Sequence, residues 1–409
     1  MNFRIFKPDF WQSVTLVEFG FLWSVLFAVW GPVPRYLGWL LAIIGLLSGK
    51  LRGNGRTGVL HPFLKAGLLF VLLWGLPSSF FRKPDLFTFL KGYSLALEFA
   101  FSLWLAARVF SKESLQRFWV VLSASVVLAI IQTLYAFFFE NHFAGLFSNI
   151  NTLGFYGVIL LPLFLSRTFE KGSVISWLVS AGILFVICLS SSSSAWIAGA
   201  FSLVLLSIMG GAKYLFKMFF LFSLFAVIFA GVWGGLERLN PELKQTFARY
   251  MDRELEQLLS FGNPSKFTTN RSFIWQGAAN LIEKYPLSGW GWGAFNDPFA
   301  KINSSWWDVK KTRLRAQNVD DAHNMYLNLS VYGGIPTTLS VLALFLFSAY
   351  RAYVFSRKKA GDQWFWIAVS ASILSILFYS LAGDVFSIRY KFACIFWYYM
   401  GFAGRSDVE

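Results

Sequence analysis

The sequence predicts an all-α protein that crosses a membrane about twelve times and carries one large helical loop. Its 409 residues are 56% hydrophobic and 14% charged, whereas soluble domains carry about 25% charged residues. Long apolar runs recur along the whole chain, without the alternating segments of about ten residues that mark the strands of a membrane barrel. One long polar interval covers residues 236–323. These observations set the fold class and place a polar domain between two groups of membrane helices.

About twelve apolar segments approach the length of about 20 residues that a transmembrane helix requires. They cover 15–31, 36–49, 63–80, 87–109, 118–139, 152–167, 173–190, 195–211, 214–235, 324–350, 363–383 and 388–404. A few are short or interrupted, so one pair is compatible with a re-entrant hairpin. The predicted units are a bundle of nine spans over 1–235, a loop domain over 236–323, and three final spans with a C-terminal tail over 324–409.

Basic residues predict the orientation of this bundle. Lys and Arg gather in even-numbered connections such as 50–56, 108–117 and 351–359, while the odd-numbered connections are poorer in charge, with 81–85 as the exception. By the positive-inside rule both termini are cytoplasmic, and the polar loop, which follows the ninth span, faces outward. The net charge of +15 therefore reflects membrane topology, and we expect no nucleic-acid partner.

The polar loop is expected to be folded. An amphipathic helix is predicted with Asn240 as its N-cap, Pro241 at its first helical position and Gly262 just past its end. Its apolar face would pack on the membrane surface or on the rest of the loop. A second helix is predicted over 270–286, and a third from Asp321 into the tenth span.

Arg271 and His323 are the candidate catalytic residues of this loop. Arg271 is predicted in the first turn of a helix capped by Asn270, where free backbone N–H groups attract anions and a guanidinium adds a fork for phosphate oxygens. The alternative is a surface ion pair. His323 is predicted near the start of a helix capped by Asp321, whose positive end favours a neutral, base-competent ring. Asp320 or Asp321 would orient that ring as in a catalytic triad; the alternative is a structural histidine.

Further polar and aromatic residues of the loop are weaker candidates for binding a substrate. Trp290 and Trp292, in G-W-G-W-G at 289–293, would stack on sugar rings or lie at the membrane interface, and glycines at this spacing let a backbone approach a ligand closely. The basic run K-K-T-R-L-R at 310–315 is either a solvated loop or an electrostatic cradle for a diphosphate. Its candidate residues are Lys310, Arg313 and Arg315.

Three candidates lie in the first half of the chain. Arg82 would bind phosphate or anchor to lipid headgroups, and Asn149 and Asn151 would bind substrate or cap the sixth span. The sequence contains no H-E-x-x-H motif, acidic cluster or Cys/His spacing, so we predict no metal and no cofactor.

Several short motifs, in order, resemble the bacterial O-antigen ligase and O-antigen polymerase superfamily. They are F-S-N-I-N-T-L-G-F-Y (147–156), R-S-F-I-W-Q-G-A (271–278), P-L-S-G-W-G-W-G-A-F (286–295) and H-N-M-Y-L-N-L-S-V-Y-G-G-I-P-T (323–337). The resemblance covers the second half of the chain by motif and the first half by hydropathy.

The resemblance implies a C-type glycosyltransferase fold in the bacterial inner membrane, with its site facing the periplasm. The implied reaction is an inverting, metal-independent transfer of a glycan from undecaprenyl diphosphate to an acceptor sugar in lipopolysaccharide biosynthesis. His323 would activate the acceptor hydroxyl or assist the leaving group, Arg271 would bind the diphosphate, and Asn324 and Tyr326 of the same motif would contact substrate. The implied acceptor is the lipid A core for a ligase, another glycan repeat for a polymerase, or a protein hydroxyl for an oligosaccharyltransferase.

One departure and one competing class stay open. The family carries an Arg near the start of the eighth span, where this chain has Ser193 or Ser194, so another residue must supply that charge. A lipid-linked glycan flippase also fits about twelve spans, but transporters place their site near the bilayer midplane at internal repeats. We see no repeat, and the polar residues are expected on one face.

Overall fold

The computed structural model describes residues 8–48, 58–82, 85–140, 142–145, 147, 149–260, 262–309, 319–358, 362–386 and 392–405. Over these residues the regular structure is helical, apart from an isolated bridge between Leu60 and Arg405. The helices are α1 (Pro8–Gln12), α2 (Leu16–Leu26), α3 (Pro32–Leu47), α4 (Pro62–Arg82), α5 (Leu86–Val109), α6 (Lys112–Glu140), α7 (Ile150–Lys171), α8 (Val174–Leu189), α9 (Ser193–Gly210), α10 (Ala212–Leu239), α11 (Pro241–Leu259), α12 (Pro264–Phe267), α13 (Arg271–Lys284), α14 (Asn296–Val309), α15 (Met325–Arg357), α16 (Gln363–Tyr379) and α17 (Ala393–Ala403). The all-α prediction is confirmed.

The chain is a multi-pass membrane protein. Seven of the described helices, α4, α5, α6, α7, α9, α10 and α15, are long and apolar enough to cross a bilayer. Five further apolar helices, α2, α3, α8, α16 and α17, are shorter. Each of the twelve predicted segments overlaps with one of these helices. However, α2 has only 11 residues, which extend about 17 Å at 1.5 Å per residue. The number of helices that span the membrane therefore stays a prediction.

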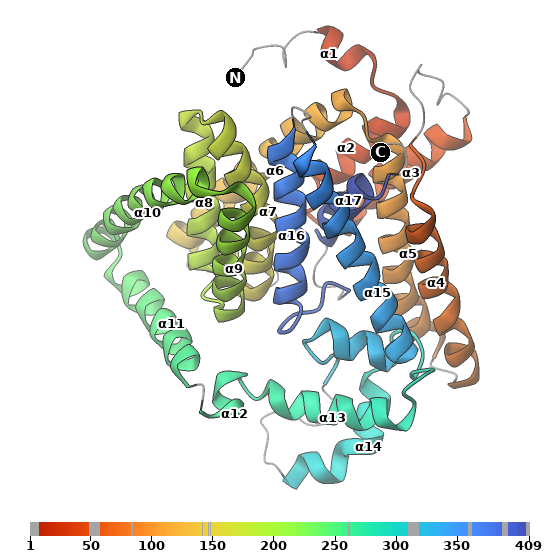
Figure 1. Ribbon diagram of the computed structural model, residues 1–409. Coiled ribbons are helices and arrows are strands. Elements are labelled where there is room, and N and C mark those ends of the chain that lie inside the picture. Colours follow the sequence, from red (N-terminus) through yellow and green to blue (C-terminus); the bar gives the residue numbers. More distant parts are fainter. Residues whose placement is uncertain are drawn as a thin grey trace.

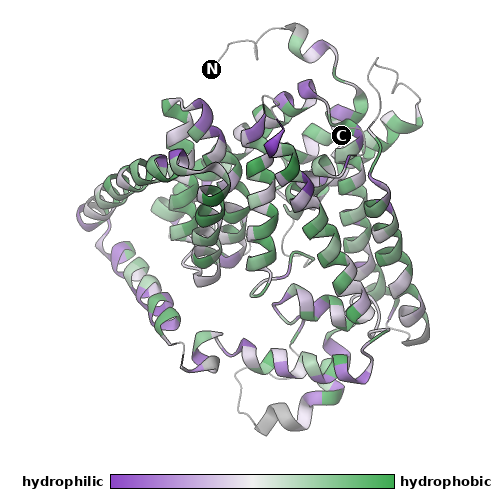
Figure 2. Ribbon diagram, in the orientation of Figure 1, coloured by the Kyte–Doolittle hydropathy of each residue, from purple (hydrophilic) through white to green (hydrophobic). Residues whose placement is uncertain are grey.

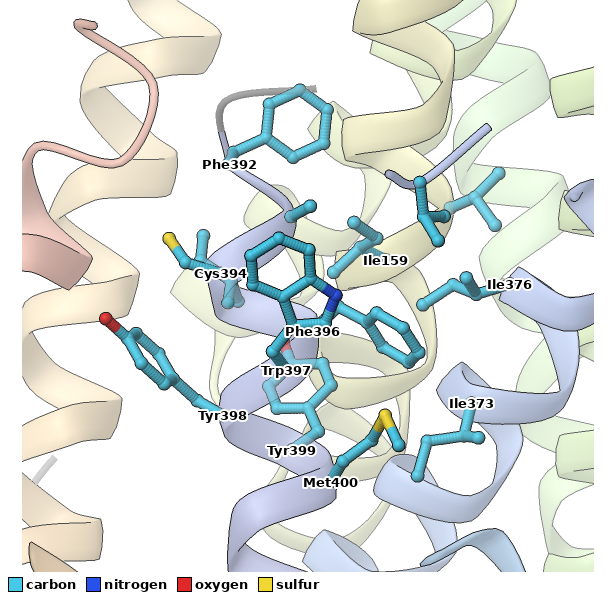
Figure 3. Packing of buried hydrophobic residues seen from close by; sticks show 14 of the residues in the cluster. Ile159, Ile373, Ile376, Phe392, Cys394, Phe396, Trp397, Tyr398, Tyr399 and Met400 are labelled. Carbon is cyan, nitrogen blue, oxygen red and sulfur yellow. The ribbon is translucent and has the colours of Figure 1, made fainter. Parts of the chain in front are cut away.

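The centre of the bundle is formed by α7, α16 and α17. Within an apolar stretch of 18 residues, 94% of the residues of α7 are buried, against 11% of those of α10. Most of the surface of α10 therefore faces outward. All eleven residues of α17 are buried. In Figure 3, Trp397 of α17 lies near Ile159 of α7, and Met400 of α17 lies near Ile373 of α16. This close packing ties the C-terminal helices to the first bundle.

The polar loop lies at one end of the bundle. In Figure 1, α12, α13 and α14 lie below the bundle, and both termini lie at the opposite end. Hydrophilic residues gather in these loop helices, while the bundle helices are mostly hydrophobic (Figure 2). This arrangement agrees with a loop and termini on opposite faces, and the assignment of those faces to periplasm and cytoplasm stays a prediction.

The loop helices match the prediction in part. The side chain of Asn240 caps α11 by accepting the N–H of Leu243 at 3.0 Å, as predicted. The apolar face of α11 packs on the bundle through Leu243 and Phe247, which join a cluster with Phe137 of α6 and Phe185 of α8. Two short helices, α12 and α14, were not predicted.

The predicted third helix differs from the observed one. It begins at Met325, not at Asp321, because the side chain of Asn324 accepts the N–H of Leu327 at 3.1 Å and so caps α15. Its backbone also breaks at Gly333 and at Gly334, where φ is 77°. The first two turns of α15 therefore form a separate short piece that carries the motif residues.

Candidate functional site

His323 and Asp321 form the centre of the candidate site. His323 lies just before α15 with φ of 48°, so the predicted position inside the helix is wrong. Oδ1 of Asp321 lies 2.7 Å from Nδ1 of His323 and also accepts its backbone N–H at 2.7 Å. The imidazole is about one-third exposed, at 36%, and the carboxylate only 10%. Because the carboxylate engages Nδ1, Nε2 is the other ring nitrogen available for proton transfer.

The segment 380–384 after α16 holds the two residues that follow His323. The backbone N–H of Met325 donates to Ser380 O at 3.0 Å and to Gly383 O at 2.9 Å. The Asn324 amide donates to Leu381 O at 2.9 Å. The turn that carries His323 is thereby fixed to the end of α16.

Arg271 is bound to the same segment. Its Nη1 donates to Ala382 O at 2.7 Å. Trp275, one turn further along α13, donates its Nε1–H to Ala322 O at 3.0 Å. The structure therefore brings Arg271 and His323 to one site, although 52 positions separate them in the sequence.

The start of α13 was predicted correctly, but its cap was not. Asn270 stands at the N-cap position with φ of 67° and makes no side-chain cap bond. Thr268 instead accepts the N–H of Ser272 at 3.0 Å. The N-terminal turn of α13 is thus partly capped by a residue two positions further back.

Asp384 and Asn328 are functional candidates that the sequence analysis missed. Asp384 is 3% exposed and Asn328 is fully buried. Oδ2 of Asp384 accepts Nδ2 of Asn328 at 2.5 Å, and Oδ1 accepts the N–H of Phe386 at 2.9 Å. Burial, followed by the nearby charge of Asp321, raises the pKa of Asp384 to about 7. A single acidic residue at the end of an apolar run was the signal that could have identified it.

Asn324 and Tyr326 make contacts within the protein. Both ends of the Asn324 amide are engaged, one in the cap of α15 and one at Leu381. The Tyr326 hydroxyl donates to Leu377 O of α16 at 2.7 Å. These side chains hold the first piece of α15 in place, and their role as substrate ligands stays a prediction.

The G-W-G-W-G segment packs against helices. Gly289, Gly291 and Gly293 all have positive φ, and Trp290 N and Gly291 N donate to Val331 O and Tyr332 O, at 2.7 and 2.9 Å. An added Cβ would meet the break in α15 at Gly289, Ser79 of α4 at Gly291 and Thr88 of α5 at Gly293. The glycines thus allow close packing of this segment against three helices.

The two tryptophans of this segment are used in packing. Trp292 is fully buried, and its backbone N–H donates to Ser79 Oγ of α4 at 3.0 Å. Trp290 is partly buried and donates its Nε1–H to Leu281 O at 2.9 Å. The expectation that Trp292 stacks on a sugar is corrected by its burial.

Ser193, at the N-terminus of α9, stands near the position where the resemblance leads one to expect an Arg. Its backbone N–H donates to Oε2 of Glu254 at 3.1 Å, and Glu254 of α11 is buried at 6% exposure. Glu254 in turn lies 3.1 Å from Nη2 of Arg253. A carboxylate from the loop therefore occupies the helix end where the resemblance leads one to expect an Arg.

Asn149 and Asn151 are also occupied within the protein. Asn149 caps α7 by accepting the N–H of Thr152 at 2.9 Å, so the capping alternative holds for it. Asn151 Oδ1 accepts the hydroxyl of Ser192 at 2.8 Å. These contacts join the starts of α7 and α9.

Four basic candidates lie outside the part of the chain that the structure describes. Lys310, Arg313 and Arg315 lie outside the described residues, as does the side chain of Arg82. Among the residues that are described, no three His, Cys, Asp or Glu side chains gather as ligands for a metal ion.

Part of the chain matches a known protein family. Residues 178–342 match the family model described as O-antigen ligase, which confirms the resemblance carried by the motifs. The matched range contains α9, the loop helices, Arg271 and His323, and ends within α15. A comparison with curated proteins finds no match.

Proposed function

We propose that this chain, whose residues 178–342 match the O-antigen ligase family, is a glycosyltransferase. It transfers a glycan from undecaprenyl diphosphate to a sugar hydroxyl. The family supports a membrane glycosyltransferase of the O-antigen ligase or polymerase type. The lipid A core is the proposed acceptor, and the periplasmic face of the inner membrane is the proposed location. The 2.7 Å contact between Asp321 and His323 is the observation that carries this proposal.

His323 acts as the general base in this mechanism. Nε2 of His323 removes the proton of the acceptor hydroxyl as its oxygen attacks the anomeric carbon of the donor sugar. The bond from that carbon to the diphosphate oxygen breaks, and the diphosphate leaves with the electron pair. Attack from the face opposite the leaving group inverts the anomeric centre. Asp321 holds the ring orientation and stabilises the imidazolium that forms.

Arg271 binds the diphosphate. Nη1 of its guanidinium donates to Ala382 O, and this contact positions the group so that its other donors bind the diphosphate oxygens. Fixed positive charge near a phosphate leaving group stabilises the charge that develops as the bond breaks. This role needs no metal ion and no nucleotide.

In vitro transfer tests this function. Purified protein in detergent receives an undecaprenyl-diphosphate glycan and lipid A core, with EDTA and without nucleotide. We expect glycosylated lipid A from the wild type and none from His323→Ala. The matched control is His142→Ala, an exposed histidine before α7, which should retain wild-type transfer.

A different product in this assay would indicate a different function. Longer glycans still attached to undecaprenyl diphosphate identify a polymerase, and wild-type product from His323→Ala removes the proposed mechanism. If the donor is competent and neither product forms, a protein acceptor and then glycan flux across vesicles are the next assays. Flux without transfer favours the flippase.

A further inference from the structure

The buried carboxyl of Asp384 has no role in the mechanism above, yet it lies beside the turn that carries His323. It accepts two hydrogen bonds, from Asn328 Nδ2 at 2.5 Å and from Phe386 N at 2.9 Å. At 3% exposure it cannot reach a glycan, so any effect on transfer must pass through its neighbours.

Asn328 links this carboxyl to the histidine turn. It is fully buried in the first piece of α15, and its Oδ1 accepts the N–H of Ala322 at 2.8 Å. An amide offers one acceptor oxygen and one donor nitrogen. Because both are used, Asp384 on one side and Ala322 on the other fix the orientation of the Asn328 side chain.

The turn from Asp321 to His323 needs such support. Ala322 lies between the two residues, and its carbonyl accepts Trp275 Nε1–H while its N–H is held by Asn328. His323 has φ of 48°, a region that is unfavourable for residues with a Cβ and persists only where surrounding contacts hold it. Without the Asn328 bond, Ala322 loses one of its two anchors.

We propose that Asp384 and Asn328 are positioning residues, which hold the 321–323 turn in the geometry that lets Asp321 orient His323. The inference deepens the proposed function and rests on it. Neither residue contacts substrate. The effect is carried through one hydrogen bond from Asp384 to Asn328 and a second from Asn328 to the backbone of Ala322.

An exchange of the two side chains tests the pair. Asp384→Asn places an amide N–H against the N–H of either Asn328 or Phe386, and Asn328→Asp removes the donor that Asp384 accepts. The double variant Asn328→Asp/Asp384→Asn reverses only the bond between the two side chains: the new amide at position 384 donates to the new carboxylate at position 328. The side chain at position 328 still accepts the Ala322 N–H, and the side chain at position 384 still accepts the Phe386 N–H. Every hydrogen bond of the wild type is therefore available again.

We expect each single variant to lower kcat at saturating donor by about 10- to 100-fold, by analogy with the loss seen when the outer partners that orient a metal-bound histidine are removed. The exchange should recover at least tenfold over the poorer single variant. Single variants with wild-type kcat, or an exchange no better than the poorer single variant, overturn the inference. Ser348→Ala is the matched control, because it removes another buried hydrogen bond from α15, to Leu344 O at 2.9 Å.

A spectroscopic measurement covers variants that are poorly active for other reasons. The chain has three histidines, so His61 and His142 can be replaced to leave the His323 Cε1–Hε1 signal alone. We expect that signal to shift in Asp384→Asn and to return in the exchange variant, and an unchanged signal in both overturns the inference. Failure of the proposed function can be distinguished from failure of this inference, because in that case the His323→Ala variant would still transfer glycan.

Discussion

Nδ1 of His323 lies 2.7 Å from Oδ1 of Asp321, and the same oxygen accepts the backbone N–H of His323 at 2.7 Å. One carboxylate oxygen thus fixes both the ring and the backbone of the candidate base. The neighbouring Asp320 is exposed, and its Oδ1 lies 3.4 Å from Asn296 Nδ2. The two adjacent aspartates have different roles, which makes them a matched pair for mutation.

Asp321→Asn should lower kcat by about 10²- to 10⁴-fold, because an amide neither holds the required tautomer nor stabilises an imidazolium; the comparable change in a Ser-His-Asp triad costs about 10⁴. Asp320→Asn should stay within about threefold of the wild type, since a surface substitution is worth about 0.5 kcal/mol. Single-turnover transfer assays measure both. Equal losses in the two variants would contradict the assignment of Asp321.

Arg271→Ala should lower kcat/KM for the lipid-linked donor by about 10- to 100-fold, the loss expected for hydrogen bonds to a charged group worth about 1.5–3 kcal/mol. Arg271→Lys should recover only part of this, because an ammonium lacks the planar fork. Arg249→Ala, on the exposed side of α11, is the control. Full activity of Arg271→Ala would remove Arg271 from the site.

The buried ion pair between α2 and α6 should be important for stability. Nη1 of Arg117 lies 2.8 and 2.9 Å from the two carboxylate oxygens of Glu18, and both residues are less than 8% exposed. Glu18→Ala leaves a buried charge without its partner and should lower the free energy of unfolding by about 3–5 kcal/mol. Glu18→Leu/Arg117→Met should restore most of it.

Equilibrium unfolding in detergent measures how these substitutions change the free energy of unfolding. The control is Glu237→Ala, since Glu237 is 69% exposed in its pair with Lys244 and should change the free energy by less than about 1 kcal/mol. If Glu18→Ala also changes the free energy of unfolding by less than about 1 kcal/mol, the buried pair adds nothing to stability.

Gly334→Ala should destabilise the protein by about 1–3 kcal/mol. Gly334 has φ of 77°, and an added Cβ would collide with the carbonyl oxygen of Leu287. Gly234→Ala in α10 is the control, because a Cβ there meets nothing within 4 Å and helix propensity favours Ala by about 1 kcal/mol. Thermal midpoints of the two variants should move in opposite directions.

Stability should depend on pH through Asp384. Its pKa is raised from an ordinary value of 3.8 to about 7 by burial, so the folded state binds a proton that the unfolded state releases. The stabilising contribution is complete below about pH 4 and is lost as pH rises through about 7. The midpoint should therefore fall more between pH 5 and 7.5 in the wild type than in Asp384→Asn. An identical pH dependence in both would assign the change to other groups.

Local patterns in the sequence were sufficient to place most helices. The apolar segments, the amphipathic pattern of α11 and the start of α13 at Arg271 follow from residues close together in the chain, because hydrophobic periodicity and turn residues act over a few positions. The motif around His323 identified the family for the same reason. Local pattern could not show that Thr268, not Asn270, caps α13, since both residues suit that role.

The site itself was decided by the tertiary structure. Ala382 lies 111 positions from Arg271 and Asp384 lies 56 from Asn328, and no local pattern encodes contacts at such separations. The sequence thus determined a helical membrane protein with a polar loop that carries Arg271 and His323. The folded chain decided that Asp321 orients the histidine, that Trp292 is buried, and that segment 380–384 joins the site, because these depend on which buried polar groups meet when α13, α15 and α16 pack together.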